Sequence, residues 1–342
     1  MERIPINVVI PTCNRKARLL SLLQNLDDSA YPIDEVIIVD SGDDKLLPSE
    51  YYIFKNLAIQ YMESERSVCI QRNTGIRMAK SPWIFLCDDD IELPSDYLQV
   101  LTAHINSHPD AGAVSGRWLQ KEKGDPIAIG WKATYPVHSA KTLLWKYFFQ
   151  LDIWGEIKVR DNMLTRKIKK YYQRKGNHIS KAGWPVLTDF SGEYFIAPVY
   201  SLGASLVRKD WLIYSPFDEV LDRYGIGDNY GVIVDFPVPE IHVINSTFVY
   251  HHREPRNRLK RSLQYYRRTL ALYYFIKTKS RLKHIKKIRL IWSLVGNLFG
   301  FLYAGEFSMV KAGLKSILKI TFNKNPYFKG NKRNMKVIEP KL

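Results

Sequence analysis

The sequence WIFLCDDDIELP, residues 83–94, joins a largely apolar run to three consecutive aspartates and then to a turn at Pro94. An uninterrupted apolar run is typical of a strand that is buried on both faces of a sheet. Like charges at the end of such a strand repel one another, and a bound cation would relieve that repulsion. The stretch therefore predicts a buried strand with a ligand site at its carboxyl end.

Strand-like and helical patterns alternate over the first 116 residues. We expect strands at 6–11, 34–40, 57–62, 83–87 and 111–116, and helices at about 15–27, 46–55, 67–79 and 95–107. Such alternation predicts an α/β fold with a mostly parallel sheet covered on both faces. Ligands of these sheets bind beyond the carboxyl ends of the strands, where the aspartates lie.

The rest of the chain divides into two parts. The pattern loosens over 117–200, apart from a basic helical stretch at 158–175, and it returns at 199–212, 217–236 and a strand-like 243–252. A basic amphipathic helical tail follows. We therefore expect one domain made of two halves, 1–118 and 119–255, with 256–342 as the tail.

The net charge of +17 belongs to this tail. Residues 251–342 hold 23 Lys and Arg against 3 Asp and Glu, which leaves 28 against 31 for the rest of the chain. A slightly acidic body with a basic, aromatic-rich tail favours an enzyme held on an anionic membrane surface over a nucleic-acid reader, and no nucleic-acid motif accompanies the charge.

The uncharged run 290–305 in the tail has 16 residues, fewer than the roughly 17–25 that span a bilayer as a helix. It predicts a helix lying in the membrane interface, with a buried packing helix as the alternative. The sequence has three scattered cysteines and opens without an apolar signal-peptide core, so we expect a reducing, cytoplasmic compartment and a peripheral position at the inner membrane face.

The three aspartates are expected to divide between two sides of the extended chain. Alternation puts Asp88 and Asp90 on one side and Asp89 on the other. Two converging carboxylates are hard oxygen ligands that suit Mg²⁺ or Mn²⁺. The alternative is a cluster at a helix start, stabilised by the helix dipole, which explains Asp96 better than the triplet.

The other strand ends bring polar groups to the same edge. The first strand opens into Pro11-Thr12-Cys13-Asn14-Arg15 and the second ends at Asp40, while Arg72 and Asn73 belong to a helix expected beneath the crevice. Each residue also has a structural interpretation, as a loop aspartate or a capping threonine.

The segments VVIPTCNR, VIIVDSGDD, RNTGI and IFLCDDDIELP, in this order, resemble the family 2 inverting glycosyltransferases of the glycosyltransferase-A (GT-A) fold. The resemblance is good over 5–118 and weaker over 198–252. It implies a nucleoside-diphosphate sugar donor bridged by a divalent cation on Asp88 and Asp90. The residues that it places at the donor are Pro11, Thr12, Asn14, Arg15, Asp40, Arg72, Asn73, Asp88 and Asp89.

The second half resembles the acceptor side of this family. LGASLVRKDW and FDEVLDRYGIGDNYG are similar to the segment that carries the general base in an acidic pair. Here the pair is Asp228-Asn229, and an amide cannot take the proton, so we predict Asp228 as the base. Asp218, Glu219 and Asp222 remain alternatives, and Asp228 could instead be a turn residue in a Gly-x-Gly loop.

His251 and His252, at the end of a late strand, offer a further metal ligand. Neighbouring strand residues face opposite ways, so one of the two is expected to reach the cation. An imidazole ligand would favour Mn²⁺ over Mg²⁺. Phosphate binding or packing is the alternative role.

The resemblance implies inverting transfer of a sugar to a hydroxyl of a glycan or lipid-linked glycan, in cell-surface polysaccharide biosynthesis. A sugar-nucleotide nucleotidyltransferase is the main alternative, although VVIPTCNRKAR has no glycine-rich loop. A basic protein that binds nucleic acid or membrane is a weaker one. The dinucleotide fingerprint G-x-G-x-x-G and the P-loop motif are both absent from the sequence.

Overall fold

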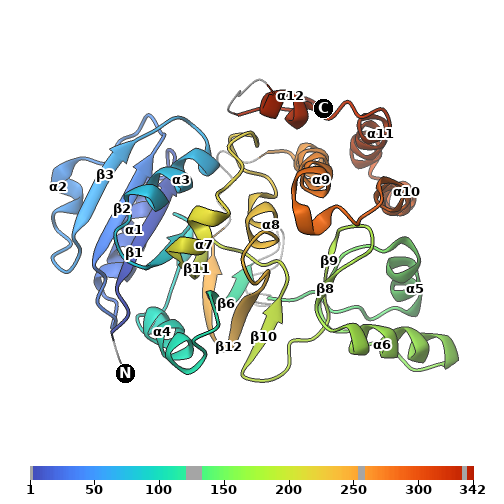
Figure 1. The fold of residues 1–342 in the computed structure, drawn as a ribbon, viewed down its shortest axis with the longest axis horizontal. Helices are drawn as coiled ribbons and strands as arrows, with labels where there is room; N and C mark the ends of the chain where they lie inside the picture. The colour runs from blue at the N-terminus through green and yellow to red at the C-terminus, as the bar shows by residue number, and fades with distance from the viewer. Residues whose placement is uncertain (1–2, 121–132, 253–258, 333–336) are drawn as a thin grey trace.

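The computed structural model of the chain describes residues 3–120, 133–252, 259–332 and 337–342. Strands and helices alternate through the first part of the chain, and helices follow at its C-terminal end (Figure 1). The α/β expectation is confirmed in these ranges. The expected boundary at 118/119 lies inside a strand, and the one at 255/256 lies outside the described residues.

One mixed sheet runs through the molecule, in the strand order β10-β12-β6-β11-β4-β1-β2-β3, with β5 paired to β12. The strands β3, β2, β1 and β4 are parallel, as the alternating sequence predicted, and β6 is parallel to β12. β11 is antiparallel to β4 and β6, and β10 and β5 are antiparallel to β12. The strand bounds are β1 (Ile6–Thr12), β2 (Glu35–Asp40), β3 (Ile59–Glu63), β4 (Trp83–Cys87), β5 (Ile91–Glu92), β6 (Ala113–Gln120), β10 (Tyr194–Ala197), β11 (Ala204–Arg208) and β12 (Ile241–His251).

Helices cover both faces of the parallel strands because side chains alternate along each strand. Val8 and Ile10 pack with α1 (Lys16–Asp27), α2 (Pro48–Tyr51) and α4 (Tyr97–Ser107), whereas Val9 packs on the other face with α3 (Val68–Met78). The second face also receives α7 (Lys209–Tyr214) and α8 (Asp228–Ile233). The parallel strands therefore end together at one buried edge.

Residues from 133 to 187 build a smaller unit with its own core. It contains α5 (Ala140–Phe149), β7 (Ile153–Trp154), α6 (Met163–Lys175), β8 (His178–Ile179) and β9 (Pro185–Leu187), and the three strands pair in the order β7-β9-β8. The helix expected at 158–175 begins at Met163, because the side-chain oxygen of Asn162 accepts the backbone N–H groups of Leu164 and Thr165 at 3.0 and 2.9 Å.

The C-terminal helices are α9 (Arg261–Thr278), the 3₁₀ turn η1 (Ser280–Leu282), α10 (Lys287–Tyr303), α11 (Phe307–Thr321) and α12 (Pro326–Lys332). The expectation of a tail appended to the domain is wrong for α9. Leu270, Tyr273 and Phe275 are fully buried in the same core as β1 and α3, and α9 packs against α8. Buried side chains surround most of this helix, which is the pattern of a core element. No helix in the described ranges is long and apolar enough to cross a membrane.

Candidate active site

The carboxyl ends of β1, β2 and β4 meet at one edge and bring Thr12, Asp40 and Asp88 to it, as the sequence predicted. Gln71, from α3, holds this edge together because its side-chain amide donates to the backbone oxygens of Thr12 and Val39 at 2.7 and 2.6 Å. Gln71 is a structural residue that sequence reasoning missed, since its partners are backbone atoms far from it in the chain.

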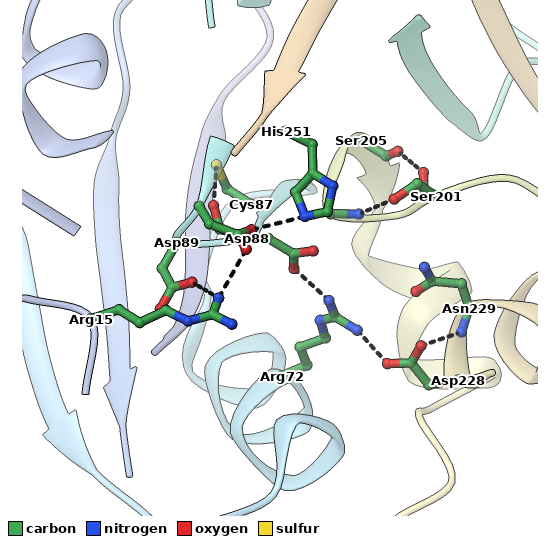
Figure 2. Close-up of polar contacts among 12 residues, drawn as sticks. Arg15, Arg72, Cys87, Asp88, Asp89, Ser201, Ser205, Asp228, Asn229 and His251 are labelled. Carbon is green, nitrogen blue, oxygen red and sulfur yellow. Dashed lines mark hydrogen bonds and ion pairs between the residues drawn. The ribbon is translucent and has the colours of Figure 1, made fainter. Parts of the chain in front are cut away.

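Arg15 pairs with two of the three aspartates. Its guanidinium lies 2.7 Å from Asp89 Oδ1 and 3.0 Å from Asp90 Oδ2 (Figure 2), and Thr12 donates to Asp89 at 2.7 Å. The expected division, with Asp88 and Asp90 together and Asp89 turned away, does not describe this arrangement. The strand ends at Cys87 and a turn occupies Asp89 and Asp90, so extended alternation does not continue through the triplet. Arg15 thus offsets the repulsion that the sequence analysis assigned to a cation.

Burial shifts the proton affinities of this pair. The carboxyl of Asp89 is almost inaccessible, and its desolvation raises its pKa to about 6, against the opposing effect of Arg15. Burial also disfavours the charged form of Arg15, but Asp89 and Asp90 outweigh it and raise the pKa of the guanidinium above its ordinary value. Arg15 therefore stays charged at every relevant pH.

Asp88 faces a different cation. Arg72 Nη2 lies 2.5 Å from Asp88 Oδ1, and the same guanidinium donates from Nη1 to Asp228 (Figure 2). Arg72 is 6% exposed and stacks over the ring of Phe217 at 5.0 Å. Gly203 passes so close to Asp88 that a Cβ there would lie 2.2 Å from Asp88 Oδ2. A larger residue at the start of β11 would therefore displace the Asp88 carboxylate from this position, a constraint not predicted from the sequence.

A Gly-x-Gly loop presents Asp228. Gly225 and Gly227 have φ angles of +58° and +96°, which favour glycine, and Asp228 opens the short helix α8 directly after them. Its Oδ1 accepts the backbone N–H of Asn229 at 2.7 Å. Burial raises the pKa of Asp228 to about 6, although Arg72 acts in the opposite direction. A carboxylate with this pKa can act as a base at neutral pH.

The alternative bases are committed to other partners. Asp218 lies 2.9 Å from Lys279, Asp222 lies 3.1 Å from Arg267, and Glu219 accepts the side chain of Asn73 at 3.1 Å. Among these four carboxylates, Asp228 is the one that lines the cavity shared with the aspartate triplet in the described structure.

The two histidines diverge, as strand alternation predicted. His251 Nε2 lies 3.3 Å from Asp90 Oδ1, and its ring packs beside Trp118 at 4.8 Å. His252 turns away and pairs with Glu92 at 2.7 Å. Asp90 and His251 therefore offer one carboxylate and one imidazole side by side, a donor set that suits Mn²⁺. Within the described ranges, no three His, Cys, Asp or Glu side chains form a complete metal site.

Three residues expected at the donor lie outside the cavity lining. Asp40 is buried and accepts from the Gly42 N–H at 2.7 Å and the Tyr61 hydroxyl at 2.6 Å. Asn14 accepts the N–H of Asp43 at 2.6 Å and shapes the loop after β2. Asn73 bonds to Phe217 through both ends of its amide, at 2.9 and 3.0 Å.

The cavity has a volume of about 600 Å³ and an acidic and an aromatic wall. The strand ends contribute Pro11, Thr12, Arg15 and the three aspartates, and Arg72 and Asp228 lie between the walls. The aromatic wall was not predicted from the sequence, because its members come from scattered segments: Trp118, Trp154, Trp184, Tyr200, Tyr224, Tyr230 and Phe275, with Arg66, Arg223 and Arg268. Aromatic faces of this kind suit the apolar side of a sugar ring.

Fold and site together define an α/β domain of the GT-A type, with an acidic rim at the strand ends and a base candidate across the cavity. Residues 7–172 match the model of glycosyl transferase family 2. The chain thus carries a family 2 glycosyltransferase domain, and this match supports the glycosyltransferase interpretation over the nucleotidyltransferase alternative.

Two curated relatives are similar to about a third of the chain. An uncharacterized glycosyltransferase of Haemophilus influenzae is 33% identical over 107 residues, which are 31% of this chain and 36% of the relative. The uncharacterized glycosyltransferase YwdF of Bacillus subtilis is 29% identical over 115 residues, which are 32% of this chain and 43% of the relative. The chain therefore matches less than half the length of either relative.

Two solved structures share the fold over nearly the whole chain. TarS 1–349 of S. aureus, in complex with UDP-GlcNAc, has a TM-score of 0.52 at 11% identity, covering 97% of this chain and 92% of that one. The mannosyltransferase PcManGT of Pyrobaculum calidifontis, in complex with GDP-Man and Mn²⁺, has a TM-score of 0.52 at 14% identity, covering 95% and 89%. At such identities the likeness shows the fold alone.

Proposed function

We propose that the protein is an inverting glycosyltransferase that moves a sugar from a nucleoside-diphosphate donor to a hydroxyl of a glycan or lipid-linked glycan. The observation that carries the proposal is the single cavity in which Asp88 and Asp228 face each other across Arg72. The diphosphate would bind at the strand ends, and the acceptor would occupy the aromatic wall. This arrangement would put the anomeric carbon between the leaving group and the base.

The residues would divide the chemistry as follows. Asp228 takes the proton of the acceptor hydroxyl as its oxygen bonds to the anomeric carbon, and the bond from that carbon to the diphosphate oxygen breaks on the opposite side. Attack opposite the leaving group inverts the configuration. Arg72 holds Asp228 in place until substrate arrives, and Asn229 supports the carboxylate through its N–H. Proton transfer to such a base contributes about 10²–10⁴-fold to the rate.

A divalent cation fits the donor side of this site. Asp90 and His251 would hold it, with Asp88 as a third ligand, and we assign no metal contact to His252, whose ring faces Glu92. When bound, Mn²⁺ or Mg²⁺ would neutralise the charge of the departing nucleoside diphosphate. Thr12 and Arg15 would fix the aspartate loop, and Pro11 would line the nucleotide side.

The remaining expected donor contacts act through the backbone in this proposal. Asp40 and Asn14 would shape the loop after β2 that meets the nucleotide, and Asn73 would tie α3 to the segment before Asp228. The 1–118 part would thus serve the donor and the 119–255 part the acceptor.

We propose a peripheral position at the anionic inner face of the membrane and a part in cell-surface polysaccharide assembly. The support is the charge of the C-terminal third, in which residues 251–342 carry 23 basic against 3 acidic side chains. Lipid-linked acceptors are presented at such a surface, and basic segments bind anionic lipids.

The proposal is tested by thermal unfolding with a panel of sugar nucleotides, each with Mn²⁺, with Mg²⁺ and with chelator. Ligands that bind only the folded state raise its stability with concentration and affinity. One donor is expected to raise the melting temperature in the presence of metal, and the same donor should release its nucleoside diphosphate when acceptor is added. Stabilisation by a nucleoside triphosphate and a sugar phosphate, with pyrophosphate release, would instead establish the nucleotidyltransferase alternative.

A further inference from the structure

Large hydrophobic side chains gather on the outside of three helices. Twenty are exposed among the described residues, and ten of these lie on α5, α10, α11 or the residue that ends α11. Figure 1 shows these helices in succession along one side of the molecule, with α10 in contact with both α5 and α11. The ten are Phe148, Ile288, Trp292, Phe299, Leu302, Tyr303, Phe307, Leu314, Leu318 and Phe322.

The residues follow helical spacing on each long helix. On α10, Ile288, Trp292 and Phe299 recur on one side, while Leu290 and Leu294 on the other side are fully buried. On α11, Phe307, Leu314 and Leu318 are exposed, while Ala312 and Ile320 are buried against the protein. Each helix therefore presents two apolar faces, one to the core and one outward, which a helix at a water-exposed surface does not require.

Side-chain contacts join the outward sides of α5 and α10, and α11 packs against α10. Phe148 of α5 packs edge to face with Trp292 at 5.3 Å, and Trp145 does so with Phe299 at 6.5 Å. Lys141 lies 4.8 Å above the ring of Tyr303. We call the exposed apolar side chains of α5, α10 and α11 together the apolar face.

The charged side chains within the three helices of the apolar face are all basic. The three helices contain seven Lys and Arg and no Asp or Glu, the basic residues being Lys141, Lys146, Lys287, Arg289, Lys311, Lys315 and Lys319. A second copy of the chain would bring seven further cations against these seven, which opposes self-association. Anionic lipid headgroups complement the charges, and acyl chains complement the aromatic and leucine side chains.

We infer that the apolar face inserts into the interface of an anionic bilayer. This inference extends the proposed membrane association to a defined surface. It rests on the proposed function only where it assumes that the acceptor lies at the membrane. Helix α10 has 17 residues, about 25 Å at 1.5 Å per residue, and one of its sides is buried in protein, so it lies along the surface rather than through it. The surface includes α5, which the charge of the C-terminal tail alone did not indicate.

The apolar face is one helix away from the cavity. Gln264, Arg268 and Leu272 of α9 line the cavity, and α9 also packs against α11. A bilayer held on α10 and α11 would therefore lie close to the acceptor side, as a lipid-linked acceptor requires. Because α9 belongs to the core, removal of the whole tail would unfold the protein, and substitutions on the surface are the suitable test.

The test is cosedimentation of the full chain with vesicles of phosphatidylcholine alone or with about a third phosphatidylglycerol. Wild type should bind the anionic vesicles, and the triple variant Phe299→Ser, Phe307→Ser, Leu318→Ser should lose about tenfold or more in partition coefficient. The matched control is Leu47→Ser, Tyr52→Ser, Ile53→Ser near α2, where the three side chains are 56, 64 and 62% exposed against 53, 76 and 57% in the test set. The control should bind as wild type does.

Equal binding by the test and control variants would overturn the inference, as would failure of wild type to bind anionic vesicles. Light scattering tests the alternative that the apolar face binds a second copy of the chain. A wild-type dimer that only the test variant disrupts, with no vesicle binding, would make the apolar face an interface between copies. Donor hydrolysis in water should be the same in all three proteins. A wild type that binds vesicles but transfers no sugar would refute the proposed function and leave this surface intact.

Discussion

Arg72 and Asp228 form a buried ion pair that joins α3, from the first half of the domain, to the start of α8, from the second. The other arm of the same guanidinium lies 2.5 Å from Asp88. One side chain thus connects the acidic rim of the proposed donor site to the proposed base. A buried cation between two carboxylates holds both in place while the cavity is empty of substrate.

Replacing Arg72 with methionine should disable the site and weaken the fold. The change keeps the apolar stem but leaves Asp88 and Asp228 without their cation, and loss of one partner of a buried pair costs about 3–5 kcal/mol. We expect a drop of that size in the free energy of unfolding, measured in guanidinium chloride, together with loss of transfer. Arg77→Met on the same helix is the control, because Arg77 is 59% exposed and its loss should change stability little. Equal effects of the two substitutions would exclude a special role for Arg72.

The pH dependence of transfer should report on Asp228. Its pKa of about 6 means that the carboxylate loses its proton-accepting form below that pH, so kcat/KM should fall on the acid side with a midpoint near 6. Asp228→Asn should abolish transfer at every pH, and Asp228→Glu should move the acid limb. If the acid limb of the pH profile is unchanged in Asp228→Glu, that titration belongs to another group.

Ionisation of Asp228 should favour transfer but lower the free energy of unfolding. Burial raises the pKa of Asp228 from 3.8 to about 6, so the folded protein binds the proton more tightly than the unfolded chain does. Ionisation as the pH rises from 3.8 to about 6 therefore lowers the free energy of unfolding. Asp228→Asn leaves Arg72 in its ion pair with Asp88, so the variant should be at least as stable as wild type at pH 7 and should lack this component of the pH dependence. Destabilisation by the amide would contradict the assigned direction.

The sequence predicted the elements better than it predicted their contacts. The strands at 6–11, 34–40 and 83–87 were expected within one or two residues, because their apolar runs and flanking turns are local signals. The direction of β11 was not predictable, since local pattern is the same for parallel and antiparallel neighbours. Burial of α9 was underestimated because its basic residues were grouped with those of the tail, whereas Leu270 to Ile276 form part of the core.

The same limit applies to the site. Asp88, Asp90, Asp228 and His251 were predicted as site residues because they lie at strand ends or after glycine turns, which are visible in sequence, and the four line one cavity. Which aspartate faces which cation depends on Arg15 and Arg72, and Asp228 is 156 positions from Arg72. The aromatic wall comes from segments spread between Trp118 and Phe275, so no spacing rule could assemble it.

The metal dependence of transfer should separate the two histidines. His251 faces Asp90 at 3.3 Å, whereas His252 faces Glu92, so His251→Ala should raise the Mn²⁺ concentration for half-maximal transfer by about tenfold or more. His252→Ala is the matched control, one residue away, and should leave that concentration unchanged. The measurement is a metal titration after chelator treatment. A larger effect of His252→Ala would reverse the assignment.

The C-terminal residues should stabilise the segment that leads to Asp228. Arg267 on α9 is 5% exposed and lies 3.1 Å from Asp222 and 2.6 Å from Glu339, while the backbone N–H of Ile338 donates to Val220 at 3.0 Å. The last described residues thus run beside 219–223 and meet it through Arg267. Arg267→Met would leave two carboxylates facing each other, Asp222 among them with no exposed surface, and should cost about 3 kcal/mol or more of unfolding free energy.

The control for this network is Arg261→Met, in the first turn of the same helix. Arg261 pairs with Glu306 at 2.7 Å but is 71% exposed, so its loss should cost less than about 1 kcal/mol. The network lies just before the Gly-x-Gly loop that presents Asp228, whereas the proposed donor site lies mainly at the ends of β1, β2 and β4. Arg267→Met should therefore lower kcat by more than it changes KM for the donor. If Arg267→Met keeps the wild-type kcat but is less stable, the network acts in folding alone. Equal stability losses for Arg267→Met and Arg261→Met would show that burial of the Arg267–Asp222 pair has no energetic consequence.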